Sequence, residues 1–280
     1  MVTPADSQPL TKEAIHALLR TTTFGRTLHI LQTTTSTNNE AMALAQQGAG
    51  DGTVVVAETQ TAGKGRLGRR WYSPPEENLY CSVIMRNVPA DDLSGWLSAV
   101  PLLSAVAVAQ AIQAVAGLKP FLKWPNDILV GDRKLGGLLC ESSLGGPSRT
   151  LARTFVVVGI GLNVNSRRES FPEEIREIAT SIAAETGRLI DRASLLATIL
   201  LELEIYSEAL LTRPPETFLS GYARLCSTLG RRVRVNLAEG KTVEGLADSI
   251  APDGSLRIIR DQANGGGVVE VRAGDIVHLR

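Results

Sequence analysis

Residues 63–71 read Gly-Lys-Gly-Arg-Leu-Gly-Arg-Arg-Trp, and no other stretch of the chain is as informative. Three glycines and four cations share these nine positions. Glycine lets the backbone adopt positive φ and approach a ligand closely. Arginine and lysine bind phosphate and carboxylate oxygens, arginine often through two parallel hydrogen bonds. The run therefore predicts a loop that wraps a small anionic ligand.

Composition sets limits on the fold and on the partners. With 280 residues, 44% of them hydrophobic, the chain can build one large domain, or one large and one small. Lys+Arg and Asp+Glu number 29 each, and this zero net charge argues against nucleic acid or a membrane as partner. Cys81, Cys140 and Cys226 show no metal-ligand spacing, and the N-terminus has no signal pattern. We expect a cytoplasmic protein.

Hydrophobic patterning predicts an α+β protein. Strands are expected at 28–31, 53–57, 79–85, 121–124, 127–130, 135–141 and 155–159. Helices are expected at 12–20, 41–47, 95–116, 172–185 and 193–211. Thr37 to Glu40 matches a capping box at a helix start. The stretch 95–116 is apolar nearly all round, which predicts a buried helix.

The pattern changes near residue 228. Val233, Val235 and Leu237 alternate with polar residues, and Pro252–Gly254 and Asn264–Gly267 read as turns between short strands. This spacing predicts a small β-barrel. The expected domains are a short extension (1–25), a larger domain with a mixed sheet and flanking helices (26–227), and the barrel (228–280).

Two familiar phosphate-binding motifs do not fit residues 63–71. Gly63-x-Gly-x-x-Gly68 matches the letters of the dinucleotide fingerprint, but that motif opens a helix. Pro74 and Pro75 follow closely and exclude a regular helix there. A P-loop would need Ser or Thr after its lysine, where Gly65 stands.

Three later runs complete a set of polar and cationic groups. They are Lys123-Trp-Pro-Asn-Asp127, Lys134-Leu-Gly-Gly137 and Gly159-Ile-Gly-Leu-Asn-Val-Asn165. Amides suit ribose hydroxyls and adenine edges, because each offers donors and an acceptor. Together with the cationic loop, these runs predict a site for a nucleoside triphosphate and an acid.

At this point the chain resembles the biotin–protein ligases. The motifs that carry the resemblance occur in that family's order: Ser36-Thr37-Asn38, Gln60–Arg69, Lys123–Asp127, Lys134–Gly137 and Gly159–Asn163. They cover residues 30–165. The resemblance implies a class II synthetase-like catalytic domain followed by an SH3-like barrel.

The chain departs from the family at two places. The loop of the family reads Gly-Arg-Gly-Arg, and here Lys64 replaces the first arginine. Lysine keeps the charge but loses the two-pronged hydrogen bonding of arginine. The residues before the first strand are also too few for the helix-turn-helix domain of the repressor members. We therefore expect a monofunctional ligase.

The family reaction has two steps. The biotin carboxylate attacks the α-phosphate of ATP, giving biotinyl-5′-AMP and pyrophosphate, and a lysine of a carrier domain then takes the biotinyl group. The resemblance implies ATP and magnesium as cofactors, biotin as substrate, and as partner the biotin carboxyl carrier protein of a carboxylase such as acetyl-CoA carboxylase. A homodimer is compatible with the sequence.

The resemblance also implies residue roles. Catalytic roles fall to Arg66, Lys134, Lys123 and Asp127. Biotin contacts fall to Ser36, Thr37, Asn38, Gln60, Gly63, Lys64, Gly65, Arg66, Lys134 and Gly136. Contacts to ATP and the adenylate fall to Arg66, Arg69, Trp71, Lys123, Asn126, Lys134, Gly161 and Asn163. Asp127 has three open roles, which are to hold magnesium through water, to accept a proton from the amine, or to pair with Lys123.

Plainer readings and rival functions stay open. Thr37 can serve only as a helix cap, and Trp71 and Trp124 can serve only as packing residues. A lipoate or octanoate ligase or transferase of the same fold is the nearest rival. A non-catalytic regulator that senses biotin is another, although it would not need the complete set of cations.

Overall fold

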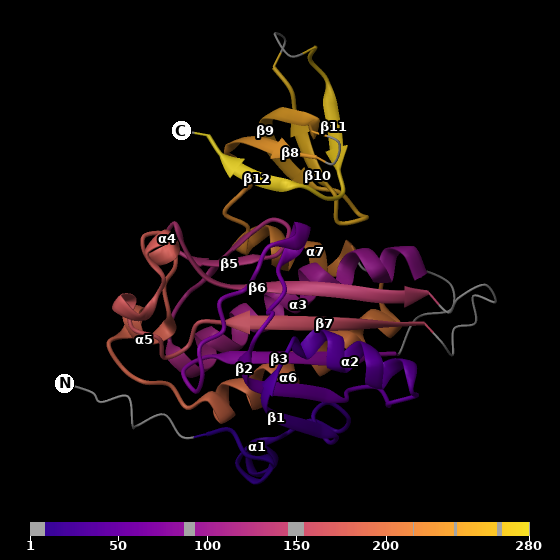
Figure 1. The fold of residues 1–280 in the computed structure, drawn as a ribbon. Helices are drawn as coiled ribbons and strands as arrows, with labels where there is room; N and C mark the ends of the chain where they lie inside the picture. The colour runs from indigo at the N-terminus through magenta and orange to yellow at the C-terminus, as the bar shows by residue number, and fades with distance from the viewer. Residues whose placement is uncertain are drawn as a thin grey trace.

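The computed structural model describes residues 9–86, 93–144, 154–214, 216–237, 240–261 and 265–279. The larger domain is built on a seven-stranded mixed sheet with the order β1-β2-β3-β7-β6-β5-β4 (Figure 1). Its strands are β1 Leu28–Thr34, β2 Val54–Gln60, β3 Leu79–Met85, β4 Phe121–Lys123, β5 Asp127–Val130, β6 Arg133–Leu144 and β7 Thr154–Leu162. Only β1 and β2 pair in parallel, and all the other neighbouring strands in this sheet are antiparallel.

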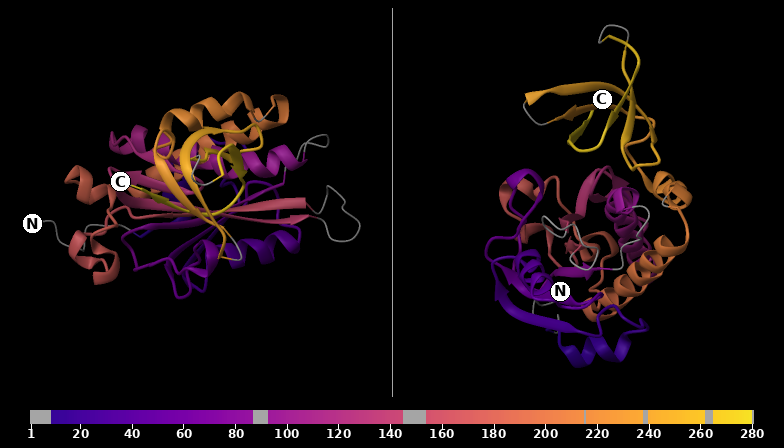
Figure 2. Two further views of the ribbon diagram at one scale, coloured as in Figure 1. Left: turned by 90° about the horizontal axis from the view of Figure 1, so that it is seen from above. Right: turned by 90° about the vertical axis from the view of Figure 1, so that its right-hand side faces the viewer.

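Helices cover both faces of this sheet (Figure 2, left). The helices of this domain are α1 Lys12–Leu18, α2 Thr37–Gln46, α3 Leu93–Ala116, α4 Glu173–Arg176, α5 Ile182–Thr186, α6 Arg192–Thr212 and α7 Glu216–Leu225, with 3₁₀ turns η2 Arg66–Gly68 and η5 Arg168–Ser170. The α+β class with a mixed sheet and flanking helices, predicted from the sequence, is therefore confirmed.

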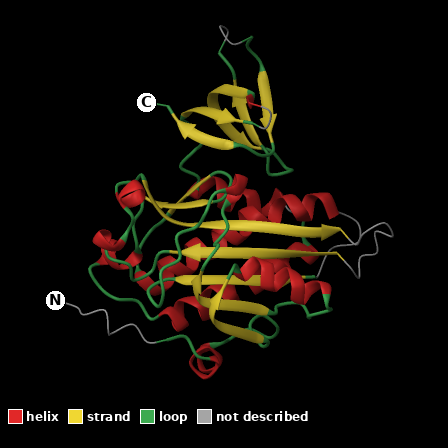
Figure 3. Ribbon diagram, in the orientation of Figure 1, coloured by secondary structure: helices red, strands yellow, loops and turns green. Residues whose placement is uncertain are grey.

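The C-terminal part forms a separate antiparallel sheet with the order β11-β10-β9-β8-β12 (Figure 3). Its strands are β8 Arg232–Asn236, β9 Thr242–Ile250, β10 Leu256–Ile259, β11 Val268–Val271 and β12 Asp275–His278. Val233 and Val235 are buried between exposed neighbours, as the alternating sequence predicts. Asn264, in one expected turn, lies outside the described residues.

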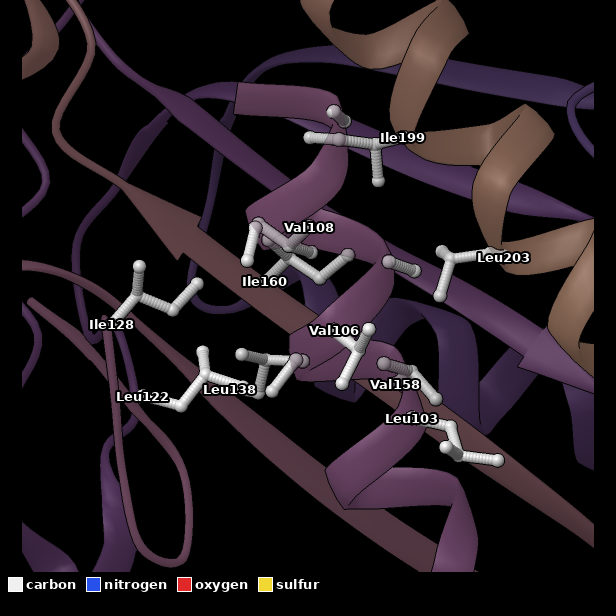
Figure 4. Packing of buried hydrophobic residues seen from close by; sticks show 14 of the residues in the cluster. Leu103, Val106, Val108, Leu122, Ile128, Leu138, Val158, Ile160, Ile199 and Leu203 are labelled. Carbon is white, nitrogen blue, oxygen red and sulfur yellow. The ribbon is translucent and has the colours of Figure 1, made fainter. Parts of the chain in front are cut away.

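The main core lies between the sheet and α3. Val106 and Val108 of α3 pack among side chains of the sheet, including Val158 and Ile160 of β7 (Figure 4). Ile199 and Leu203 of α6 belong to the same cluster, as do the other side chains that Figure 4 labels: Leu103, Leu122, Ile128 and Leu138. The buried helix predicted at 95–116 is therefore confirmed. By length and hydropathy α3 could cross a membrane, but 72% of its most apolar window is buried inside the protein.

A smaller core lies under α2 on the opposite face of the sheet. Ala41 and Ala45 pack there with Val55 of β2 and Val157 of β7. Val54 and Val56 belong to the main core instead, because successive side chains of a strand point to opposite faces. Helix α2 is thereby held in place, with its first turn at the end of the sheet where the polar motifs collect.

Two local predictions are wrong. The N-cap of α2 is Ser36, so the capping box predicted at Thr37 to Glu40 does not form. Thr37 N–H donates instead to Gln60 of β2, and the Glu40 carboxylate accepts from Thr34 Oγ1 of β1 at 2.9 Å. The single helix expected at 172–185 is broken into α4 and α5. Between them, Lys134 exchanges backbone hydrogen bonds with Ile178 and Thr180, which pulls this segment into an extended form.

Candidate functional site

The predicted motifs converge where α2 begins, β2 ends and the first residues of β6 meet the last residues of β7. The register pairs Gly136 with Leu162 and Gly137 with Gly161. A side chain at Gly136 would collide with the backbone of β7, since its Cβ would lie 2.8 Å from the Gly161 carbonyl oxygen. The two strands can therefore approach closely only because glycine stands at this position.

Thr37 and Asn38 of the Ser36–Asn38 motif form a hydrogen-bonded group with Gln60 of β2 and Ser82 of β3. The Thr37 backbone N–H donates to Gln60 Oε1 at 2.9 Å, and Gln60 Nε2 donates to Ser73 Oγ at 3.0 Å. Ser82 Oγ lies 2.8 Å from Thr37 Oγ1 and 2.6 Å from Asn38 Oδ1. Each side chain is thus held in one orientation, as recognition of a neutral polar ligand requires.

Asn38 is almost fully buried beneath this group. Its Nδ2 donates to the Leu139 carbonyl at 3.1 Å and to Glu141 Oε2 at 2.7 Å. Gly159 of β7 faces the same amide so closely that a Cβ there would lie 2.0 Å from Asn38 Oδ1. The glycine at 159 therefore makes room for the Asn38 side chain.

We expect Gly159→Ala to destabilise the protein by about 1–3 kcal/mol, because the new methyl group overpacks the site of Asn38. Thermal unfolding followed by circular dichroism measures the change. Gly50→Ala is the matched control, since a Cβ at Gly50 meets nothing within 4 Å. An equal melting temperature for the two variants would show that the Asn38 site tolerates the methyl group.

The cationic run folds into a short loop around η2. Gly65 N–H donates to the Arg69 carbonyl at 2.7 Å, and Trp71 N–H donates to the Gly63 carbonyl at 2.8 Å. Leu67 at its tip has φ 56°, an uncommon value for a residue with a side chain, and is 70% exposed. We refer to residues 63–71 as the cationic loop.

Four cations of the site each contact a protein oxygen. Arg66 Nη1 donates to Asn126 Oδ1 at 3.0 Å, and Lys134 Nζ donates to Asp127 Oδ1 at 2.6 Å. The other two pairs are Arg69 with Asp275, through distances of 3.1 and 2.5 Å, and Lys64 with Glu141 at 3.5 Å. Carboxylates thus hold Lys134 and Arg69 at close range, whereas the contact of Lys64 is looser.

Burial lowers the pKa of Arg66, but nearby Asp127 and Asp275 oppose this effect. The pKa of Asp275 is lowered, first by the hydrogen bond from Arg69 and further by the charges of Arg69 and Lys123. The Asp275 carboxylate of β12 is therefore held beside the cations of the larger domain. This contact joins the C-terminal sheet to the cationic loop.

The structure decides among the pairings of Asp127. Lys123 stands opposite Asp127 in the β4–β5 register, yet the Asp127 carboxylate accepts from Lys134. Pairing with Lys123 is one of three roles that the sequence leaves open for Asp127, and the contact in this structure is with Lys134 instead. The pKa of Asp275 is lowered first by the hydrogen bond from Arg69, and the pKa of His278 is lowered first by burial. The charge of Lys123 adds a smaller lowering effect to both.

The side chains of Trp71 and Asn163 have different surroundings. The Trp71 ring lies against Gly161, where a Cβ would be 2.7 Å from Trp71 Cε2, and its centroid is 5.5 Å from Lys134 Nζ. Within the described ranges, Trp71 Nε1 is buried and has no hydrogen-bond partner. Asn163 is 5% exposed and donates to the Thr180 carbonyl at 2.9 Å, so its amide serves the protein interior.

Sequence reasoning missed four residues of this network: Ser73, Ser82, Glu141 and Asp275. Ser82 carried a usable signal, because it is a polar residue inside the otherwise apolar strand β3. Asp275 carried none, since its partner Arg69 is 206 positions away in the chain.

Metal binding by protein side chains alone has little support. Among the residues that the structure describes, no group of three or more His, Cys, Asp or Glu side chains could hold a metal ion. Cys81, Cys140 and Cys226 are unpaired, and burial raises the pKa of the Cys140 thiol to about 12.

Two family models match the chain. Residues 29–163 match the "Biotin/lipoate A/B protein ligase family", and residues 228–279 match the "Biotin protein ligase C terminal domain". The "Biotin--[acetyl-CoA-carboxylase] ligase" of Mycobacterium tuberculosis is 38% identical over 258 residues, covering 91% of this chain and 90% of that protein. The "Bifunctional ligase/repressor BirA" of Bacillus subtilis is also 38% identical, over 70% of this chain but only 58% of its own length.

Solved structures agree with these matches. The biotin protein ligase from Aquifex aeolicus, in complex with biotin and ATP, superposes with a TM-score of 0.75 at 28% identity, covering 91% of this chain and 99% of that one. The Leishmania major ligase, in complex with biotinyl-5-AMP, superposes with a TM-score of 0.57 at 25% identity, covering 89% of this chain and 99% of that one.

Proposed function

The chain belongs to the biotin–protein ligase family, and on that premise we propose that it activates biotin with ATP and transfers the biotinyl group to a lysine of a carrier protein. One observation carries the proposal. Lys64 of the cationic loop shares Glu141 with Asn38 of the polar group, and Arg66 and Lys134 contact the adjacent residues Asn126 and Asp127. Such an arrangement would offer cations to phosphates close to hydrogen-bonding groups for a neutral ring.

In the first proposed step, a carboxylate oxygen of biotin attacks the α-phosphorus of ATP. The bond from that phosphorus to the β-bridging oxygen breaks, and pyrophosphate leaves. Two anions must approach each other, so Lys134 and Arg66 would neutralise the charge that they share. Preorganised cations in a site of low polarity stabilise such a transition state more than water does.

In the second proposed step, the neutral amine of the carrier lysine attacks the acyl carbon of the adenylate. The bond from that carbon to the phosphate oxygen breaks, AMP leaves, and the nitrogen gives up a proton to solvent water. Asp127 is close enough to Lys134 to hold that cation against the leaving phosphate. We assign it this role in place of pairing with Lys123.

Magnesium fits the site only together with ATP. The protein offers the Asp127 carboxylate beside Lys134, and Mg²⁺ usually binds through one or two carboxylates plus substrate phosphates. Asp127 would hold such an ion, which when bound supplies positive charge to the phosphate oxygens.

The carrier is proposed to be the biotin carboxyl carrier protein of a carboxylase. The support is the name of the Mycobacterium tuberculosis relative, whose match covers nearly the whole of both chains. We place the reaction in the cytoplasm, in accord with the three unpaired cysteines.

Intact mass spectrometry of a carrier domain tests the function. The protein is incubated with ATP, Mg²⁺, biotin and the carrier, and parallel reactions replace biotin by lipoate or octanoate. A mass increase of one biotinyl group is expected with biotin alone. Tight biotin binding without transfer would favour the sensor, and transfer only of lipoate or octanoate would favour the rival ligase.

Binding should also change the dynamics of the cationic loop. We expect amide hydrogen exchange in residues 63–70 to slow when biotin and ATP are added, because the cations of the loop gain ligand oxygens as partners besides Glu141 and Asp275. Exchange measured by mass spectrometry with and without the ligands checks this. Equal protection in both states would show that the loop is already ordered before binding.

A further inference from the structure

Glu141 of β6 connects two parts of the site that lie far apart in the sequence. Its Oε2 accepts from Asn38 Nδ2 at 2.7 Å, and its Oε1 lies 3.5 Å from Lys64 Nζ. Asn38 stands in the first turn of α2, and Lys64 belongs to the cationic loop. One carboxylate therefore joins the polar group of the site to its cations.

With the contact from Glu141, both the amino group and the oxygen of the Asn38 side-chain amide have hydrogen-bond partners. Both Nδ2 protons are used, one by Glu141 and one by the Leu139 carbonyl, while Oδ1 lies within hydrogen-bond distance of Ser82 Oγ. Because Asn38 is 3% exposed, water does not replace a lost partner easily. Glu141 thus helps to fix the amide, and through it the start of α2.

The contact with Lys64 is looser and leaves the ammonium group available. A distance of 3.5 Å exceeds the roughly 2.7–2.9 Å of a strong charge-assisted hydrogen bond. An ammonium group has three donors, so one contact with Glu141 leaves others for a ligand oxygen. Lysine side chains also lose rotamer entropy when they are fixed. Attraction to Glu141 restricts Lys64 before any ligand arrives.

We propose that Glu141 is a positioning residue for biotin, acting through Asn38 and Lys64. The inference rests on the proposed function and adds to it a residue that the motifs of the family resemblance do not include. Lys64 stands where the resemblance expects an arginine, so its single ammonium lacks the planar fork that would orient it. Glu141 supplies that orientation from the neighbouring strand.

Two other roles predict different results. An ordinary surface ion pair would contribute little to stability and nothing specific to biotin. A counter-ion that competes with biotin for Lys64 would weaken binding, so its removal would make biotin bind more tightly. The positioning role instead predicts weaker biotin binding with unchanged use of ATP.

Isothermal titration calorimetry of biotin binding to the 280-residue chain tests the proposal. The KM for ATP and the melting temperature are measured in parallel. Glu141→Gln keeps an acceptor for Asn38 and removes the charge, so we expect the biotin Kd to rise about 2–5-fold, as for loss of an exposed ion pair. Glu141→Ala removes both contacts, and we expect a rise of about 5–100-fold. KM for ATP and the melting temperature of Glu141→Gln should match the wild type.

A double-mutant cycle tests whether the effect of the Glu141 charge on biotin binding depends on Lys64. In a Lys64→Ala background, Glu141→Gln should no longer change the biotin Kd, because the charge acts through Lys64. Glu270→Gln, which removes the charge from an exposed pair with Arg257, is the control.

Three outcomes would contradict either the proposed function or the proposed role of Glu141. If the wild type does not bind biotin, the proposed function itself fails. If it binds but Glu141→Gln binds equally or more tightly, Glu141 does not position the ligand. If Glu141→Gln impairs biotin and ATP alike and lowers the melting temperature, its role is only structural.

Discussion

Replacing Lys134 by alanine is expected to lower kcat/KM for biotin transfer by about 10²–10³-fold, by analogy with the removal of an oxyanion-hole donor. The backbone of Lys134 is fixed by hydrogen bonds with Ile178 and Thr180. Its ammonium lies 2.6 Å from Asp127 and near the Trp71 ring. The variant loses a positioned cation and also leaves the Asp127 carboxylate unpaired where anionic phosphates must bind.

Steady-state biotinylation of the carrier domain measures the Lys134 effect. Lys119→Ala is the control, because Lys119 is exposed and lies outside the site. Activity of Lys134→Ala within threefold of the wild type would contradict a catalytic role for this residue.

The second large effect concerns stability. Glu58→Ala is expected to reduce the free energy of unfolding by about 3–5 kcal/mol, because it leaves the Arg192 guanidinium buried without its counter-ion. The two side chains are 2% and 1% exposed. Arg192 Nη1 donates to Glu58 Oε2 at 2.6 Å and Nη2 donates to Oε1 at 3.2 Å, while Leu10 N–H donates to Oε1 at 2.8 Å. The pair joins β2 to the start of α6.

Urea denaturation measures this loss. Glu270→Ala is the matched control, since its partner Arg257 is exposed and such pairs contribute about 0–1 kcal/mol. Replacing both buried residues, as Glu58→Leu with Arg192→Met, should recover much of the stability because no charge is left unpaired. A Glu58→Ala loss as small as that of the control would show that water or a shifted side chain replaces the carboxylate.

Much of the fold follows from local patterns. The β-branched run of β2, the apolar strand β3 and the alanine-rich α3 are recognisable because burial imposes a period on the sequence. Helix α7 was not predicted, and the helix expected at 172–185 is broken by pairing with Lys134, a contact from another part of the chain.

The candidate site, like the fold, combines features that the sequence predicts with contacts that only the structure shows. The sequence by itself determined that residues 63–71 form a cationic loop and that its motifs follow the order of the biotin–protein ligases. Only the tertiary structure decided which oxygen each cation contacts: Asp127 for Lys134, Glu141 for Lys64 and Asp275 for Arg69. A side chain chooses among distant partners by their distance and burial after folding, and these leave no periodic mark on the sequence. Residue types therefore reveal the chemistry available, whereas the packing of β6, α2 and β12 determines which groups meet.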